Sequence, residues 1–430
     1  MPGFNPVRAV SSLIPEPGPR RTYALANLIN SFGFGLMIVS MPLYFSRIVH
    51  LTTGQIGLGL TIAVAVGMLA GVPIGDLADR RGPLQVAKAM LLVQCGTAVA
   101  FLFLRNFAGF AAVSTLDTLA LTASMSASGA LLRRVGGEDA TGFRASTYAL
   151  TSLGISLGTV CCGIAIQLGT PLAYHALIIA DAATFLVAWV LMLRLPHYDP
   201  LPKPAKAPRW GAVVDRPFVA YTALAGAMQM QFFVITLLLP LWVADNTHAP
   251  RWCISLFLII NTILVVLLQV RVSNRVQTIR QGGIAMRRAG VIFLFSCSAI
   301  GFATGLPGWA ALLVLIAAVC LHTFGELWHQ AGTFALSFGL PPAHAQGQYE
   351  GLLGIGTGIG SAVAPALFLG PILGLGRPGL IGLGVYFALV GLLMTAVARW
   401  GERTRPASPQ AADADSASRQ DAAVEGYPAS

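Results

Sequence analysis

The chain has 430 residues, of which 55% are apolar and 10% are charged, and its mean hydropathy is +0.72. Soluble domains contain about 25% charged residues, so the composition argues against a soluble enzyme. It also argues against a nucleic-acid-binding protein, in spite of the net charge of +10. The apolar content excludes a disordered chain, and the long apolar runs differ from the short alternating strands of a membrane β-barrel. The composition therefore predicts an all-α polytopic membrane protein.

The first 21 residues contain five prolines and three arginines but no long apolar stretch. We therefore expect no cleavable signal peptide in this part of the chain. Residues 1–21 are predicted to be a cytoplasmic N-terminal segment, and the first apolar run is expected to direct insertion into the membrane.

Apolar runs of about 20 residues, long enough to cross a bilayer as a helix, follow along the rest of the chain. We predict twelve transmembrane helices, over 22–46, 54–75, 83–104, 108–132, 145–168, 172–194, 217–243, 252–271, 289–305, 308–333, 347–373 and 378–399. A Pro-rich basic segment at 195–216 is predicted to be a cytoplasmic linker between a bundle at 22–194 and a bundle at 217–400. The last segment, 401–430, is rich in Ser, Ala, Asp and Pro and is predicted to be a disordered cytoplasmic tail.

The Lys and Arg residues predict the orientation in the membrane. When the N-terminus is placed in the cytoplasm, only four of the 27 fall on the outer side, namely Arg47, Arg105, Arg251 and Arg377. This distribution follows the positive-inside rule and accounts for the net charge without an acidic partner. Only three of the 27 are Lys, which suggests a GC-rich bacterial genome. We therefore expect a multi-pass protein of the bacterial cytoplasmic (inner) membrane with both termini in the cytoplasm.

The loop between the second and third predicted helices reads GDLADRRG over residues 75–82. It resembles the signature of the major facilitator superfamily (MFS) in that loop, which has Gly, any residue, Leu, Ala, Asp, Arg, any residue and Gly. The twelve helices and their division into six and six agree with the resemblance, which covers about residues 24–400. The resemblance implies two six-helix bundles with a central site between them.

The resemblance also implies that this loop holds the cytoplasmic side shut when the outer side is open. Gly75 and Gly82 allow a tight turn and a close approach of helices. Asp76 is expected to accept hydrogen bonds from a helix N-terminus across the bundle interface, and Asp79 is expected to pair with Arg80. The alternative is a charged loop that only sets the topology.

Other segments are similar to exporter-like transporters that are common in actinobacteria, namely LPLW (239–242), THAP (247–250) and GELW (325–328). The signatures of proton-coupled drug antiporters are only partly present. The fourth helix carries Asp117 instead of the expected basic residue, and the fifth helix has Thr159 and Val160 instead of the expected Gly-Pro pair. Pro83 stands where the loop signature usually continues with a basic residue, and the equivalent loop of the second half, 271–288, lacks the motif.

Small residues at four-residue spacing allow helices to approach closely, and glycines recur in this way in the second, fifth and eleventh helices. In the superfamily these helices contribute to the interface between the two halves, so their glycines are predicted to form it. Static packing predicts the same residue types. The glycines assigned to this interface are Gly67, Gly71, Gly154, Gly158, Gly356 and Gly360.

Three acids fall well inside predicted helices, namely Asp117, Asp181 and Glu326, and acids in the membrane are usually functional. The resemblance places the fourth and tenth helices at the central cavity, so Glu326 and Asp117 are predicted to couple transport to protons. His322 and His329 lie four and three residues from Glu326 and share its helix face, where a His–Glu–His ladder can hold or pass a proton. The histidines could instead bind substrate or neutralise Glu326, and the ladder could serve packing alone. Asp181, on a peripheral helix, is predicted to make a structural hydrogen bond.

Polar and aromatic residues on the first, seventh and tenth helices are candidates for the substrate cavity. Positions 229 and 231 point about 200° apart on a helix, so at most one of these two glutamines faces the cavity squarely. Trp328 is expected to stack on an apolar substrate. The cavity candidates are Asn27, Asn30, Gln229, Gln231 and Trp328.

These patterns predict a secondary active transporter that exports a small, largely apolar organic molecule against entering protons by alternating access. The alternatives are a symporter or uniporter that imports a polar solute, and a non-transporting membrane sensor. We find no phosphate-binding loop, nucleophile elbow or metal motif, and the six cysteines form no CxxC pair. We therefore expect no enzyme activity, no cofactor and no metal site. The expected partners are the small-molecule substrate, protons and the lipid bilayer, and the chain is expected to be a monomer that binds no nucleic acid.

Overall fold

The computed structural model describes residues 14–200, 208, 210–250 and 252–405. Over these ranges the regular secondary structure is entirely helical, and twelve helices are long and apolar enough to cross a membrane. The predicted all-α fold with twelve spans is thereby confirmed. Residues 1–13 of the predicted N-terminal segment, the predicted tail from 406 onward and Arg251 lie outside the described residues.

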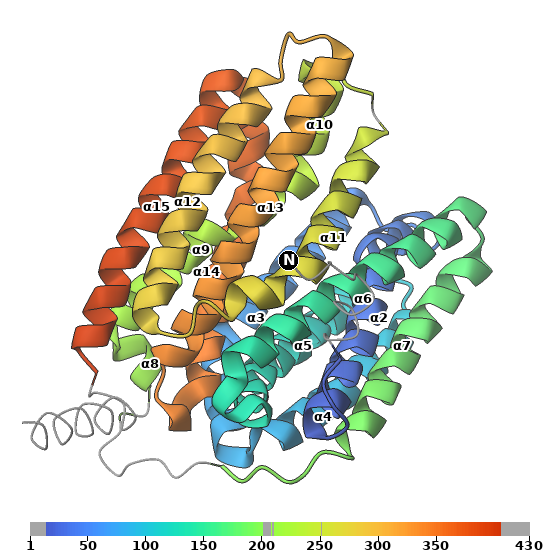
Figure 1. The fold of residues 1–430 in the computed structure, drawn as a ribbon. Helices are drawn as coiled ribbons and strands as arrows, with labels where there is room; N and C mark the ends of the chain where they lie inside the picture. The colour runs from blue at the N-terminus through green and yellow to red at the C-terminus, as the bar shows by residue number, and fades with distance from the viewer. Residues whose placement is uncertain (1–13, 201–207, 209, 251, 406–430) are drawn as a thin grey trace, which may run out of the picture.

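The first half of the chain forms six long helices (Figure 1). They are α2 (Pro19–Arg47), α3 (Thr53–Arg81), α4 (Pro83–Phe101), α5 (Phe107–Gly136), α6 (Ala140–Leu168) and α7 (Pro171–Met192), with a 3-10 turn, η1 (Gly137–Asp139), before α6. Their limits follow local sequence signals. Proline occupies the first position of α2, α4 and α7, where its missing N–H costs no helical hydrogen bond. Gly82 joins α3 to α4 with φ of 90°, a conformation that favours glycine.

The second half also supplies six membrane-length segments, but its first segment is interrupted. The helix α9 (Arg216–Gln229) ends at a turn, a π-helical segment η2 (Val234–Leu238) follows, and α10 (Leu239–Asn246) completes the crossing. The short helix α8 (Gly211–Val214) precedes α9. The remaining elements are α11 (Cys253–Ser273), α12 (Ile279–Phe302), α13 (Gly308–Gly339), η3 (Ala343–Ala345), α14 (Gln346–Leu367), η4 (Phe368–Ile372) and α15 (Arg377–Arg403).

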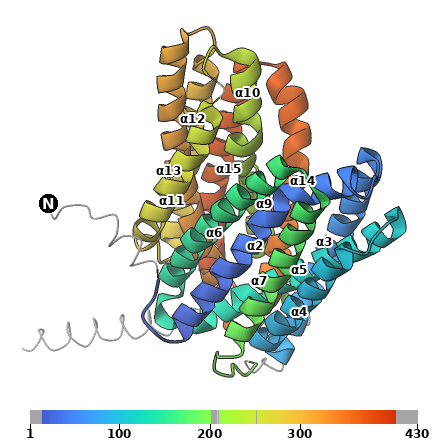
Figure 2. The same ribbon diagram turned by 90° about the vertical axis from the view of Figure 1, so that its right-hand side faces the viewer.

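The helices α2–α7 pack into one bundle and α9–α15 into a second, as Figure 1 and Figure 2 show. Aromatic rings fill much of the first core, where the Phe45 ring lies 4.5 Å from that of Phe110. In the second core the buried Trp242 donates its indole N–H to the carbonyl oxygen of Ile300 at 3.0 Å. A buried indole needs such a partner, so Trp242 is an internal anchor between α10 and α12.

The predicted interface glycines pack mainly within their own bundles. Gly154 and Gly158 of α6 face the backbone of α2, and Gly356 and Gly360 of α14 face that of α9. Gly67 faces Thr118 of α5, also within one bundle. Among the six predicted glycines, Gly71 alone faces the opposite bundle, where a Cβ would lie 2.9 Å from the carbonyl oxygen of Gly351. The prediction was therefore wrong for the other five, because small-residue spacing indicates close packing without saying which helix is the partner.

Replacing Gly360 with Ala is expected to destabilise the second bundle. The added Cβ would overlap the carbonyl oxygen of Gly226, and forced overpacking in a core costs about 1–3 kcal/mol. The temperature of unfolding of the purified protein in detergent should fall by several degrees. Gly354→Ala is the matched control on the same helix, because a Cβ there meets nothing within 4 Å. Equal unfolding temperatures for Gly360→Ala and wild type would contradict the close packing of α14 on α9.

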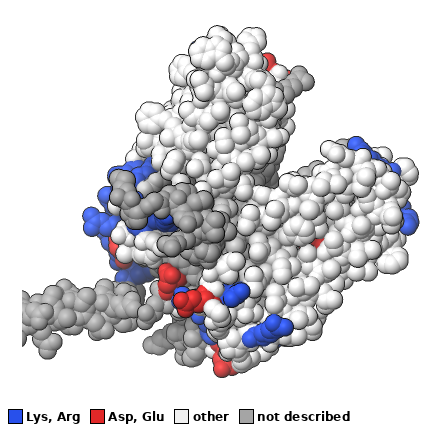
Figure 3. Space-filling model, turned by 45° about the vertical axis from the view of Figure 1, so that its right-hand side comes forward, with Lys and Arg blue, Asp and Glu red and all other residues white. Residues whose placement is uncertain are grey.

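The two bundles meet at one end of the molecule and lean apart toward the other (Figure 1). We call the shared end the basic end, because it carries the Arg-rich helix ends and loops, including Arg80, Arg81, Arg134, Arg194, Arg275 and Arg403. The bundles touch where α3 packs on α14 and α6 packs on α11. Figure 3 shows the resulting notch between two lobes whose sides are largely uncharged. The structure is thus closed at the basic end and open at the opposite end.

Candidate functional site

The loop motif lies where α3 meets the first turn of α14. Both carboxylate oxygens of Asp79 accept hydrogen bonds from this turn, one from the N–H of Gly347 at 2.8 Å and the other from the N–H of Gln348 at 2.9 Å. These N–H groups have no partner within their own helix, and the N-terminus of a helix dipole favours a negative charge. Asp79 therefore joins the first bundle to the second.

Asp76 has a different role from the one that its position in the motif predicts. Its carboxylate forms an ion pair with Arg80 at 2.8 Å and accepts a hydrogen bond from the side-chain amide of Gln348 at 3.1 Å. The helix N-terminus is bound by Asp79 instead, so the predicted assignment of Asp76 to it was wrong. The two acids lie three residues apart on α3, so their side chains point in different directions. Of the two, Asp79 points at the backbone N–H groups of Gly347 and Gln348.

Close backbone packing brings these groups together. A Cβ at Gly75 would overlap the carbonyl oxygen of Gly347, and a Cβ at Gly351 would overlap that of Gly71. Only glycines allow α3 and α14 to approach this closely. The contact uses Gly71 and Gly75, which the sequence analysis named, together with Gly347 and Gly351, which it did not.

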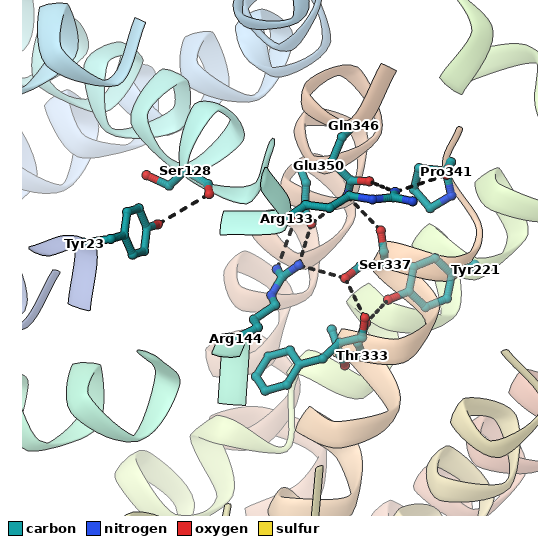
Figure 4. A network of polar contacts seen from close by, with 11 residues as sticks. Tyr23, Ser128, Arg133, Arg144, Tyr221, Thr333, Ser337, Pro341, Gln346 and Glu350 are labelled. Atoms are coloured by element: carbon teal, nitrogen blue, oxygen red, sulfur yellow. Dashed lines mark hydrogen bonds and ion pairs between the residues drawn. The ribbon is translucent and has the colours of Figure 1, made fainter. Parts of the chain in front are cut away.

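A second connection between the bundles is an ion pair that the sequence analysis missed (Figure 4). Arg144 of α6 binds Glu350 of α14 through two hydrogen bonds, at 2.6 and 3.3 Å. The Glu350 side chain is only 9% exposed and that of Arg144 is 18% exposed. Arg144 also donates to the hydroxyl of Ser337 at 2.8 Å, and its guanidinium lies 4.7 Å from the centre of the Phe338 ring. Two-point pairing in this semi-enclosed setting is strong and directional.

A second arginine of the first bundle supports the same contact. Arg133 donates to the side-chain carbonyl of Gln346 at 2.6 Å and reaches the backbone oxygen of Pro341 at 3.4 Å. Gln346 in turn donates to Glu350 at 3.3 Å, so the two arginines belong to one network (Figure 4). Glu350 is the sequence feature that could have revealed this network. It is an acid at the start of the predicted eleventh helix with no Lys or Arg among its near neighbours in the chain.

Glu326 lies at the meeting point of three helices from both bundles. Its Oε1 accepts a hydrogen bond from the hydroxyl of Tyr148 on α6 at 3.0 Å, and its Oε2 accepts one from the amide of Asn261 on α11 at 2.8 Å. The hydroxyl of Tyr148 also accepts a hydrogen bond from Gln330 at 3.1 Å. Glu326 is 7% exposed. It is therefore a buried acid that links the second bundle to the first, without a Lys or Arg among its hydrogen-bond partners in the described residues.

The predicted His–Glu–His ladder does not form as a hydrogen-bonded chain among the described residues. His322 turns toward the break in the seventh span, where its Nε2 lies 3.2 Å from the backbone oxygen and 3.1 Å from the side-chain oxygen of Gln231. Its Nδ1 lies 3.3 Å from the hydroxyl of Ser296. His329 is 2% exposed, and its Nδ1 has no hydrogen-bond partner within the described residues. The three side chains share a helix face, as expected, but His322 and Glu326 turn to different neighbours.

The five predicted cavity residues lie in different surroundings. Gln231 is buried against His322, and Asn27 donates to Thr151 of α6 at 2.7 Å, so both link helices within their own bundles. Trp328 packs inside the second bundle, where the guanidinium of Arg288 lies 4.8 Å from its ring centre, so its predicted place at the cavity was wrong. Trp328 is two residues from Glu326, which puts it on the opposite side of α13. Asn30 and Gln229 are partly buried.

The other two intramembrane acids share a cavity inside the first bundle. Asp117 of α5 accepts a hydrogen bond from Thr97 of α4 at 2.7 Å. Asp181 of α7 lines the same cavity of about 220 Å³, and its Oδ1 has no hydrogen-bond partner among the described residues. The predicted structural hydrogen bond of Asp181 is therefore absent at this oxygen, which lies against Gly33 of α2, where a Cβ would be 2.5 Å from it.

The sequence matches the model of a known protein family over most of its length. The family model described as Major Facilitator Superfamily matches residues 23–365. The chain belongs to this superfamily. This MFS chain matches no curated protein sequence.

Solved structures share the fold of this MFS transporter at low sequence identity. A bacterial homologue of the iron transporter ferroportin in an outward-facing state has a TM-score of 0.69 and 16% identity, with 90% of this chain and 100% of that chain covered. The fucose:proton symporter of E. coli has a TM-score of 0.67 and 12% identity, with coverage of 89% and 98%. The human organic anion transporter MFSD10 has a TM-score of 0.61 and 14% identity, with coverage of 92% and 100%. These proteins are named for different substrates, so the likeness establishes the fold of a multi-pass membrane transporter and nothing narrower.

Proposed function

We propose that this MFS transporter exports a small, largely apolar organic molecule in exchange for protons. The observation that carries the proposal is Glu326. It is a buried acid without a basic hydrogen-bond partner in the described residues, and its carboxylate is hydrogen-bonded to both bundles through Tyr148 and Asn261. A proton on Glu326 changes the charge at the junction that the two bundles must break in order to move. Protonation and bundle motion are then linked by one carboxyl group.

We also propose an orientation and a state. The basic end faces the cytoplasm of a bacterial cell, according to the positive-inside rule, and the structure is then outward-open. The Asp79 contact with α14 and the Arg144–Glu350 pair hold the cytoplasmic side closed. The uncharged walls of the notch favour a substrate with large apolar surface.

Proton movement in acid-loaded inside-out vesicles tests the proposal. The lumen of such vesicles is the periplasmic side, so an exported compound added outside should enter as protons leave, and a pH-sensitive dye in the lumen should report alkalinisation. The compounds are a panel of lipophilic and polar molecules, and vesicles without the protein are the control. Alkalinisation with lipophilic compounds is the expected result. Compound uptake into the vesicles without proton movement would contradict coupling, and accumulation of a polar solute in whole cells would favour the importer.

A further inference from the structure

The cavity inside the first bundle has features of a binding site. It lies between α2, α3, α4, α5 and α7, in the half of the bundle away from the basic end. Its exposed lining residues include Phe34, Ile38 and Leu60, which are 44%, 48% and 38% exposed and mark its mouth. Its volume of about 220 Å³ is below the 300–1,000 Å³ of typical sites for drug-sized ligands, so it suits a smaller molecule.

The polar groups of this cavity are two acids and one amide, and no basic side chain is found among its lining residues. Asp117 and Asp181 both line it, and the only polar lining residue besides them is Gln94, also deep in the bundle. Asp181 and Gln94 are 5% and 3% exposed, and one side-chain oxygen of each has no hydrogen-bond partner among the described residues. None of the residues found to line the cavity is Lys, Arg or His. Two carboxyl groups thus line one apolar space without a basic lining residue. A ligand that donates hydrogen bonds and carries positive charge would complement them.

The rest of the wall is apolar and aromatic. Phenylalanines from four helices contribute to it, namely Phe34, Phe45, Phe101, Phe110 and Phe185, and the remaining lining residues are aliphatic, methionine or proline. Such a wall binds an apolar body, and aromatic faces also attract a cation. It suits neither a sugar, which needs many hydrogen bonds, nor an anion, which two carboxyl groups would repel. The described residues also hold no group of three or more His, Cys, Asp or Glu side chains able to bind a metal ion.

We propose that this cavity binds a small organic ammonium ion, with the charged nitrogen between Asp117 and Asp181 and an aryl or short alkyl body against the phenylalanines. The ammonium group would donate to the carboxylates of Asp117 and Asp181, which both line the cavity. The assignment rests on the proposed function in one respect, namely that the bound amine is the exported substrate.

Direct binding to the purified protein in nanodiscs tests the site. The probe is tritiated 2-phenylethylamine at neutral pH, and unlabelled 2-phenylethanol, which has a similar shape and no charge, is the competitor. The amine should bind, and the alcohol should compete at least about tenfold more weakly than unlabelled amine, because charge-assisted hydrogen bonds are lost. Asp181→Asn and Asp117→Asn should each weaken amine binding by about 10- to 100-fold. Asp245→Asn, an exposed acid of the second bundle, is the matched control and should bind normally.

Two further variants keep the outcome interpretable. Leu121→Trp narrows the cavity without changing an acid and should also reduce binding. It therefore tests the site even if the Asp variants fail to fold. Glu402→Gln, at an exposed acid near the end of α15, should bind the amine as wild type does. Equal competition by the alcohol, or undiminished binding in both Asp variants, would overturn the site. If the amine binds but drives no proton movement, the site is supported and the exchange is contradicted. If neutral compounds exchange for protons and the amine does not bind, the exchange is supported and the site is contradicted.

Discussion

Replacing Glu326 with glutamine is expected to reduce proton-coupled transport to the level of vesicles without the protein. Glutamine has nearly the same shape, but its amide cannot release or take up a proton at the junction between the bundles. The hydrogen bonds from Tyr148 and Asn261 both lose their charged acceptor, and one of the two acceptor oxygens is replaced by an NH2 group. We expect a loss of about 1–2 kcal/mol that leaves the fold intact. Alkalinisation of inside-out vesicles by a transported compound should disappear, and any residual compound exchange should no longer depend on pH.

The matched control is Glu402→Gln, the same chemical change at an exposed position near the end of α15. It should transport as wild type does. Asp117→Asn provides a comparison with the second predicted coupling acid, which lies in a different bundle and has a different partner, Thr97. Unchanged proton movement in Glu326→Gln at every pH would remove this residue from the coupling mechanism.

Replacing Glu350 with glutamine is expected to open the basic end. Removing one member of a buried ion pair costs about 3–5 kcal/mol, because the remaining charge stays desolvated. Here Arg144 would remain between Phe334 and Phe338 without its carboxylate partner. In the state with the basic end open, water reaches Arg144, so the equilibrium between the two states shifts toward that state by about two to four orders of magnitude.

Distances between spin labels at positions 81 and 403 measure this shift. Arg81 ends α3 and Arg403 ends α15, both are exposed, and they belong to different bundles at the basic end. The distance distribution should move to longer values in Glu350→Gln and stay unchanged in Glu402→Gln. Combining Arg144→Gln with Glu350→Gln should restore part of the short-distance population, because neither charge is then buried alone. A distribution identical to wild type in Glu350→Gln would show that the ion pair does not hold this end closed.

The class of protein, the number of spans and the loop motif between α3 and α4 follow from the sequence alone. These features are local. The length of an apolar run, a proline at a helix start and a glycine at a turn act within a few residues of the chain, so no packing information is needed to interpret them. The motif also predicted that an aspartate binds a helix N-terminus across the interface, although it assigned the wrong one of two aspartates.

The identity of the side chains that meet depends on the packing of the whole chain. Arg144 and Glu350 are separated by 206 positions in the chain, and no local sequence pattern marks either of them as part of a contact between the bundles. Helical periodicity places His322 and Glu326 on one face of α13, yet the neighbouring helices draw them to Gln231 and to Tyr148. Asp181 likewise shares a cavity with Asp117 because α7 and α5 enclose the same space. The spacing of residues along a helix defines its faces, but the partner of each face depends on how helices that are distant in sequence pack together.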